Sequence, residues 1–521
     1  MSTRSNEGAR TRRSLVAAGL GLSLVTASAC SGASTGGDDE SGGGDAATIV
    51  IALPEEPVSL DPCDASYTEN NRVLTDNVTE ALMRRDPETG DLTPGLATEW
   101  AQVDDRTYDF TLREGVEFSD GTPLDAAAVA VAVNRSFRPE HECGVKGFIF
   151  NDEDLEATVV DDATVRIQAT QADPILPLRI SFIEIGHTDE NAKTDAPIGT
   201  GPYVLDDWQR RTSITLTRNP GYWGDAPSIE TVRYVFRAES SVRADLVRTG
   251  EADLAIALAP QDKGDGKGVQ TFELAETLFL RIDTFAEPLD DLDVRKAVNL
   301  AIDRDGLTAG VMQGQGTPAS QIIAQNINGY DPSIDVWPYD PDEAKALVAG
   351  AAARGVDVSK EITLYTRAGF YPNSDQVMEG VAEMLRQVGL NIKIQQLDAA
   401  AWLDDVLRQP KNPERVGLTE NVHGNNTGDA VFTVVTKYSS DGDESTLDDP
   451  ELDSMINAAA AATGDERGEL FREVMRYITT DIVAMVPIAH LGGSLIMSDR
   501  LSYTPNLQSA DILRVSDMTI G

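Results

Sequence analysis

The chain carries at residues 90–129 the stretch GDLTPGLATEWAQVDDRTYDFTLREGVEFSDGTPLDAAAV. Apolar residues alternate with polar ones from Tyr108 to Leu112, which predicts a β-strand with one buried face. The tetrapeptide SDGT (119–122) then supplies turn-forming residues, and Asp125 can cap a helix through the alanine and valine residues that follow. The stretch therefore predicts a strand, a turn and a capped helix in close succession.

Other parts of the chain predict further strands and helices. A β-rich segment at 361–367 precedes an amphipathic helix at 374–389 and a second strand at 390–398, an order typical of a parallel α/β unit. Hairpins are expected around Asp161 and within 203–218. Over this length the mixture fits two α/β lobes, and a cleft between lobes is a common place for a ligand to bind.

Helical spacing and capping residues predict three more helices. Apolar residues recur at helical spacing between Val73 and Met83, which predicts a helix within 69–86. A second helix is expected to start near Asp293, and Asp340 can cap a third.

Composition narrows the class of protein and of partner. The chain has 521 residues, enough for two or three domains, and its 41% hydrophobic and 25% charged residues are typical of a globular protein. The formal net charge of −43 argues against a nucleic acid or an anionic membrane surface as the partner, because like charges repel.

The first thirty residues have the order of an export signal. A basic start is followed by a short apolar run and by small residues before Cys30, which predicts a signal peptide over 1–29. Ala27 to Cys30 resembles a bacterial lipobox, which implies that Cys30 is lipidated and that 30–47 forms a flexible tether. The alternative is a soluble secreted protein cut near Ala29, and the export route, Sec or twin-arginine, stays open.

The three cysteines have separate expected roles. If Cys30 carries lipid, Cys63 and Cys143 remain as an even pair outside the cytoplasm. Such a pair is expected to be oxidised, so a Cys63–Cys143 disulfide is predicted, with two free thiols as the alternative.

Several segments together resemble the family 5 extracellular solute-binding proteins, the peptide- and nickel-type binding components of ABC importers. The opening stretch carries the patterns L-x-P-x-L-A-x-x-W and T-Y-x-F-x-L-R-x-G-V-x-F-x-D-G. The other matching segments, in chain order, are SLDP (59–62), GTGPYVL (199–205), LTRNPGYWG (216–224), DVRKAVNLAIDR (293–304), YDPDEAKALV (339–348) and MLRQVGLNIKIQQLDAAAW (384–402).

The resemblance implies an α/β, two-lobed periplasmic-binding-protein-like fold with mixed sheets, an extra inserted domain and a ligand cleft between lobes that close by hinge motion. The implied divisions are domain I in the first lobe (46–82, 196–276 and 488–521), domain II inserted in that lobe (83–195), and domain III as the second lobe (277–487).

The resemblance also implies a function. The expected protein is a monomeric binding lipoprotein on the outer face of the cytoplasmic membrane. It would deliver a small solute, peptide-like by expectation, to an ABC permease and its ATPase, without a cofactor and without enzymatic activity. No H-E-x-x-H, C-x-x-C or Walker motif is present, although the many carboxylates leave a hydrolase on this scaffold as an alternative.

Two segments can be compared with the peptide-binding members. Arg367 lies where those members have R-x-x-x-P-N, and a guanidinium there suits a ligand carboxylate; a structural ion pair is the alternative. The segment 422–432 resembles W-x-x-D-x-x-D-P-x-x-F, with Asn425 in place of the aspartate that pairs with a peptide ammonium. Asn425 cannot neutralise an ammonium, and Asp429 could substitute for that aspartate.

A nickel-chelate ligand is the alternative within the same family. His423 invites this interpretation because imidazole is a good nickel ligand, but the four histidines show no pair with close ligand spacing. Further candidates for the wall of the cleft, by the same resemblance, are Tyr67, Arg138, His141 and Phe148.

Overall fold

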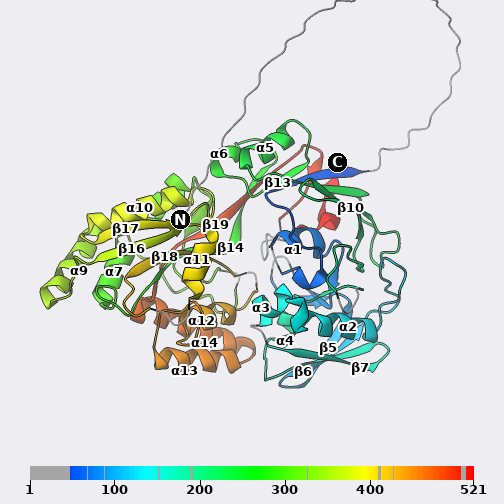
Figure 1. Ribbon diagram of the computed structural model, residues 1–521, viewed down its shortest axis with the longest axis horizontal. Helices are drawn as coiled ribbons and strands as arrows, with labels where there is room; N and C mark the ends of the chain where they lie inside the picture. Colours follow the sequence, from blue (N-terminus) through cyan, green and yellow to red (C-terminus); the bar gives the residue numbers. More distant parts are fainter. Residues whose placement is uncertain are drawn as a thin grey trace, which may run out of the picture. The chain divides into compact units, whose positions relative to one another are not determined.

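The computed structural model describes residues 47–521 (Figure 1). Within that range, residues 67, 87–88, 151–152, 188–191, 326, 409–411, 426 and 506–511 are outside the description. Cys30, the predicted signal peptide and Tyr67 therefore lie outside the described residues.

A mixed sheet of eleven strands is the largest feature, in the order β10-β11-β12-β1-β13-β19-β14-β18-β16-β17, with β15 also paired to β19. β1 runs parallel to β12 and β13, whereas β10, β11 and β12 form antiparallel pairs, as the predicted hairpin within 203–218 requires. These strands are β1 (Thr48–Leu53), β10 (Tyr203–Gln209), β11 (Ser213–Arg218), β12 (Thr231–Phe236) and β13 (Leu254–Ile256).

Two long antiparallel strands occupy the middle of this sheet. They are β14 (Val269–Ile282) and β19 (Met485–Met497), and their register shifts between Glu273 and Thr277. β19 also pairs with β13, and β14 also pairs with β18 (Gly417–Gly424). Both divisions proposed between domains I and III, at 276/277 and 487/488, therefore fall inside continuous strands.

The second group of strands contains the predicted parallel unit. β16 (Glu361–Arg367) runs parallel to both β17 (Asn391–Leu397) and β18, and α10 (Ser374–Gln387) connects β16 to β17. The apolar stripe of α10 enters the core beside α7 (Leu292–Leu300) and α9 (Pro341–Arg354). The predicted cap is present, since the Asp340 carboxylate accepts a hydrogen bond from the Glu343 amide at 2.9 Å.

The opening stretch forms part of a separate antiparallel sheet in the order β5-β6-β8-β7. Its strands are β5 (Ala97–Asp104), β6 (Thr107–Leu112), β7 (Leu155–Asp161) and β8 (Thr164–Ala169), with α2 (Ala126–Ser136) in the same core. The Asp125 carboxylate accepts from the Ala128 amide at 2.8 Å, so the predicted strand, turn and capped helix are all confirmed.

The remaining elements are short strands and helices. The strands are β2 (Glu80–Ala81), β3 (Met83–Arg85), β4 (Leu92–Pro94), β9 (Glu184–Ile185), β15 (Gly316–Pro318), β20 (Leu501–Ser502) and β21 (Thr519–Ile520). The α-helices are α1 (Thr68–Leu74), α3 (Gly144–Phe150), α4 (Leu176–Ile180), α5 (Ser240–Arg248), α6 (Pro260–Lys263), α8 (Arg304–Gly306), α11 (Ala399–Leu407), α12 (Val431–Tyr438), α13 (Pro450–Ala461) and α14 (Gly464–Arg476). Short 3₁₀ turns (Pro62–Asp64, Pro139–His141, Val515–Asp517) and π turns (Leu307–Val311, Tyr477–Ile482) complete the set.

The helix predicted within 69–86 is wrong beyond Leu74, because long-range contacts override the local spacing. Asp76 adopts a left-handed backbone with φ of 58°, which ends helical geometry. The buried Asn77 side chain donates to the Leu513 carbonyl at 2.8 Å and accepts from the Val515 amide at 2.9 Å. These contacts to the C-terminal segment fix a turn that leads into β2 and β3.

The predicted disulfide is present. Cys63 is bonded to Cys143, with 5.2 Å between the Cα atoms and a sequence separation of 80. It connects the 3₁₀ turn Pro62–Asp64 with the start of α3, so it fixes the first segment of proposed domain I to proposed domain II.

We expect reduction of this disulfide to lower the stability of the protein by about 2–5 kcal/mol, because a loop of that length restricts the unfolded chain. Thermal unfolding with and without dithiothreitol measures the effect. The Cys63→Ser/Cys143→Ser variant is the control, since dithiothreitol should leave its melting temperature unchanged. A wild-type melting temperature insensitive to full reduction would contradict the prediction.

We expect Gly199→Ala to destabilise the protein by about 3 kcal/mol, because an added Cβ would lie 1.9 Å from the Val78 carbonyl oxygen. Backbone atoms there cannot move without disturbing the turn after α1. Gly147→Ala is the matched control, since a Cβ on Gly147 meets no atom of the described structure within 4 Å. Chemical denaturation compares the two variants, and equal midpoints would refute the assignment.

Candidate functional site

A cavity of ≈ 430 Å³, which we call the His423 cavity, lies between residues of proposed domains I and II and residues of proposed domain III. Near it, the Arg179 guanidinium of α4 lies over the Phe432 ring of α12 at 5.2 Å. The cavity is lined by Ala65, Ser66, Asn71, Thr75, Asp76, Ala81, Met83, Arg84, Arg85, Phe148, Ile149, Ser181, Phe182, Glu184, His423, Gly424, Thr427, Phe432, Thr436, Glu444, Ile512 and Arg514.

One wall of the His423 cavity carries a buried ion-pair network. The Asp76 carboxylate forms an ion pair with Arg84, with 3.0 Å between Oδ1 and Nε, and accepts a hydrogen bond from Arg514 Nε at 2.7 Å. Arg84 also pairs with Glu80, and the two carboxylates keep its pKa above the usual value despite the opposing effect of burial. The turn after α1, which stands in place of the predicted helix, thus brings residues of β2, β3 and the C-terminal segment together.

Glu184 of β9 adds a buried carboxyl group to the same cavity. Burial raises its pKa to about 8, and the nearby Asp76 and Glu80 charges reinforce the shift. Arg85, in contrast, has its pKa lowered to about 10 by burial. Its guanidinium lies over the Phe182 ring at 5.6 Å, so an aromatic face supports the cation.

His423 forms part of the opposite wall. Its Nε2 is 2.7 Å from Thr433 Oγ1, and burial, assisted by the charge of Lys437, lowers its pKa to about 3. The imidazole is therefore neutral at physiological pH. Burial alone would raise the pKa of Glu444, but the adjacent Lys437 outweighs that effect and lowers the value to about 2.

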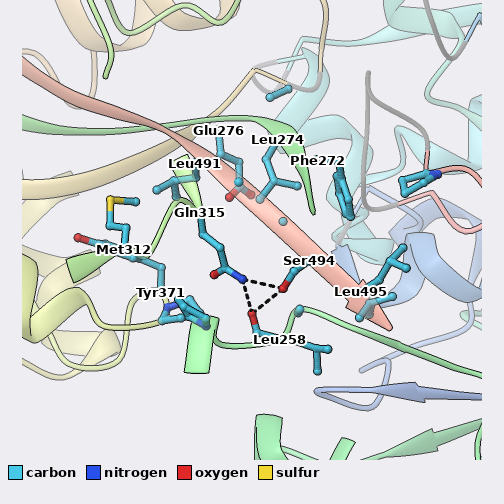
Figure 2. A pocket seen from close by; sticks show the side chains of 18 of the residues that line it. Leu258, Phe272, Leu274, Glu276, Met312, Gln315, Tyr371, Leu491, Ser494 and Leu495 are labelled. Carbon is cyan, nitrogen blue, oxygen red and sulfur yellow. Dashed lines mark hydrogen bonds between the residues drawn. The ribbon is translucent and has the colours of Figure 1, made fainter. Parts of the chain in front are cut away.

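A second cavity of ≈ 300 Å³, the Ser494 cavity, lies against β14 and β19 (Figure 2). Gln315 Nε2 donates to Ser494 Oγ at 2.7 Å and to the Leu258 carbonyl at 3.1 Å, and Ser494 Oγ donates to the same carbonyl at 2.9 Å. Most other side chains around it are apolar or aromatic: Ile256, Leu258, Phe272, Leu274, Met312, Phe370, Tyr371, Leu491, Leu495, Tyr503 and Leu513.

The two cavities share two segments of the proposed first lobe. On α1 and the residue after it, Asn71 and Thr75 line the His423 cavity, whereas Arg72 lines the Ser494 cavity. In the C-terminal segment, Arg514 lines the His423 cavity and Leu513 lines the Ser494 cavity. A ligand longer than either cavity could therefore contact both along one side of α1.

The structure places Arg367 beside, and not within, the lining of the Ser494 cavity. Its guanidinium lies 4.5 Å from the Phe370 ring and 5.6 Å from the Trp402 ring. Its backbone amide donates to Glu420 Oε2 at 2.9 Å. Because Phe370 lines the cavity, Arg367 supports the wall through a stacked aromatic ring.

Asn425 and Asp429 have their side chains engaged in internal contacts. The Asn425 amide donates to the Ile322 carbonyl at 3.1 Å, and both Asp429 oxygens accept from Arg467 at 2.8 Å. Neither residue lines the two cavities. Their predicted contact with a ligand remains a prediction, and the Asp429 charge is already compensated.

Among the other predicted wall residues that the structure describes, Phe148 lines the His423 cavity, whereas Arg138 and His141 do not. Phe148 is 62% exposed and lines both this cavity and a shallower pocket next to it. Arg138 lines that second pocket, and His141 is buried in the Pro139–His141 turn.

Sequence reasoning missed the charged group formed by Asp76, Arg84, Glu184 and Arg514. No local motif marks these residues, since Arg514 is 438 positions from Asp76. The adjacent arginines of the MRRD stretch (83–86) were the only signal in the sequence for a charged site. The helix expected there would have oriented their side chains differently.

Two further structural facts bear on the site. Among the described residues, no three His, Cys, Asp or Glu side chains are close enough to hold a metal ion together. Within the same described part of the chain, no helix is both long and apolar enough to cross a bilayer.

Known proteins resemble the chain over most of its length. The probable di/tripeptide-binding protein 5 of Pseudomonas aeruginosa (strain UCBPP-PA14) is 25% identical over 488 residues, covering 85% of this chain and 90% of that protein. The ABC transporter-associated periplasmic binding protein DppA of Helicobacter pylori, solved with the peptide STSA, has a TM-score of 0.73 at 20% identity, covering 91% of this chain and 98% of that one.

A third relative is NikA of Staphylococcus aureus, solved with Ni(L-His)₂, with a TM-score of 0.71 at 19% identity, covering 91% of this chain and 100% of that one. These likenesses confirm the two-lobed α/β fold with mixed sheets. Residues 91–443 match the bacterial extracellular solute-binding proteins, family 5 middle. The chain therefore belongs to the family 5 bacterial extracellular solute-binding proteins.

Proposed function

We propose that the protein is an extracytoplasmic binding lipoprotein that captures a peptide or a similar small polar solute and delivers it to an ABC permease. The observation that carries the proposal is the pair of adjacent cavities along α1, lined by residues of both proposed lobes. The di/tripeptide-binding protein of P. aeruginosa and the peptide complex of H. pylori DppA support a peptide ligand.

The chemistry of the two cavities suits a short peptide. The His423 cavity presents both signs of charge, which match the ammonium and carboxylate ends of a peptide. The Ser494 cavity is mainly apolar and can take a nonpolar side chain. Their volumes of ≈ 430 and ≈ 300 Å³ are within the usual size of small-molecule sites.

Lobe closure would act through β14 and β19. In the proposed division into domains I, II and III, the chain passes between the lobes inside these two strands. The pairing of β14 with β19 is irregular between Glu273 and Thr277. Small backbone rotations there would therefore disturb the fewest hydrogen bonds between the two strands. The charged walls of the His423 cavity would then close on the ligand from opposite sides.

A chelated metal is the second candidate ligand, favoured by the neutral His423 imidazole in the cavity wall and by S. aureus NikA. A metal bound here would arrive with its own chelator, because the described residues provide no cluster of three metal-ligating side chains. A hydrolase on the same scaffold is the alternative from another class, and product formation would identify it.

Trialanine and Ni(L-His)₂ separate these candidates by isothermal titration calorimetry. We expect wild-type protein to bind trialanine without cleaving it, and a concentration of 100 times Kd to stabilise the fold by about 2.7 kcal/mol. We expect His423→Ala to weaken trialanine binding less than threefold, because a neutral imidazole contributes no ionic contact.

For a metal-chelate binder, the same variant should instead lose more than tenfold in affinity for Ni(L-His)₂. Mass spectrometry of the titrated trialanine is the control, because cleavage to dialanine would show an enzyme. Binding of the nickel complex with no binding of trialanine would contradict the peptide proposal.

Lipid attachment has its own test in cells. We expect globomycin, which blocks lipoprotein signal cleavage, to leave the unprocessed precursor, and Cys30→Ala to lose the lipid mass. Intact-protein mass spectrometry of the membrane fraction measures both. A mature product of unchanged mass in globomycin-treated cells would rule out the anchor.

A further inference from the structure

Glu184 is a buried acid in the wall of the His423 cavity, and one of its carboxyl oxygens has no hydrogen-bond partner among the described residues. It begins β9, which pairs with β2 through Ala81. The residue is 5% exposed, and among the described residues no hydrogen-bond donor reaches its Oε2 atom. An unpartnered carboxyl oxygen in such a position is costly, because burial removes water without supplying another donor.

The other charged groups around Glu184 do not compensate it. Asp76 and Glu80 act on it as like charges, and only the Thr75 and Thr79 hydroxyls oppose their effect on its pKa. Two of the arginines that line the cavity pair with other carboxylates, since Arg84 pairs with Asp76 and Glu80, and Arg514 pairs with Asp76. The other titratable groups that line the cavity are Arg85, His423 and Glu444.

We propose that Glu184 binds the ammonium group of the ligand. This inference rests on the proposed function. Glu184 would supply the negative charge for the peptide ammonium, which the neutral Asn425 cannot neutralise. An ammonium N–H would supply the donor that Oε2 lacks, in a buried place where a charge-assisted hydrogen bond is strong. A free α-amine or a lysine side chain fits this chemistry, and an N-acylated peptide does not.

Ligand binding is then coupled to proton release. Glu184 is mostly protonated in the free protein at pH 7, since its pKa is about 8. On binding, the carboxyl O–H bond breaks, the proton passes to solvent, and the carboxylate accepts a hydrogen bond from the intact ammonium. Affinity therefore rises with pH below 8, by at most about tenfold per unit, and falls again as the ligand amine itself deprotonates.

The binding experiment compares trialanine with N-acetyl-trialanine by calorimetry at pH 6.0 and 7.5. We expect wild-type protein to bind trialanine about tenfold more tightly at the higher pH and to release a proton, seen as a dependence on buffer ionisation enthalpy. We expect Glu184→Gln to bind about 10–100-fold more weakly at pH 7.5 and to show no gain in affinity between pH 6.0 and 7.5. Glu156→Gln, an exposed glutamate on β7, is the matched control and should behave as wild type.

A second measurement needs no ligand. A carboxyl whose pKa is raised by folding destabilises the native state increasingly as pH rises from its unfolded value of about 4.3 to about 8. Glu184→Gln should therefore raise the melting temperature of the free protein, more at pH 8 than at pH 5. A residue that merely supports the fold would give the opposite sign, because its removal lowers the melting temperature.

The outcomes separate the two proposals. If trialanine binds and either N-acetylation or Glu184→Gln leaves its affinity unchanged, the role of Glu184 is refuted while the binding function stands. If wild-type protein binds no amine-bearing peptide at millimolar concentration, both are refuted. A lower melting temperature of Glu184→Gln at pH 8 would also refute the inference.

Discussion

The antiparallel pairing of β14 and β19 is the interaction on which the arrangement of both cavities depends. It joins the β1 group of strands to the β16–β18 group, and the Ser494 cavity lies directly against it. At the position where Thr277 pairs with His490, Thr277 Oγ1 and His490 Nδ1 are also 2.9 Å apart. Residues 277–282 of β14 and 485–491 of β19 are all buried, so both faces of this part of the pair are covered by the rest of the fold.

Buried ion pairs complete the site by holding segments that are distant in sequence. Arg135 and Asp61 are almost fully buried and 2.7 Å apart, and Arg467 holds Asp429 with similar geometry. Removing one partner of such a pair costs about 3–5 kcal/mol, because the other charge stays buried alone. Glu184 differs from these pairs, since its Oε2 atom has no hydrogen-bond partner among the described residues. Its buried carboxyl is retained at a cost to stability, as ligand-binding groups often are.

Much of the scaffold could be predicted where the signal is local. The Asp125 and Asp340 caps, the strand–helix–strand unit at 361–398 and the hairpin around Asp161 all depend on residues within a few positions of each other. The helix expected within 69–86 could not be corrected from the sequence. Its end at Leu74 depends on contacts between Asn77 and the C-terminal segment. Local periodicity contains no information about such contacts.

The sequence by itself determined the family, and with it the two-lobed α/β scaffold, because several segments resemble that family in the right order along the chain. It also predicted the helix caps, which depend on neighbouring residues, and the disulfide, which followed from the cysteine count if Cys30 carries lipid. Only the tertiary structure decided which charges meet in the His423 cavity. It places Asp76 beside Arg514 and Glu184 in the same wall, and it engages Asn425 and Asp429 in internal hydrogen bonds. The physical reason is that the protonation state and free bonding capacity of a side chain depend on its burial and neighbours, and the fold brings these neighbours from distant parts of the chain.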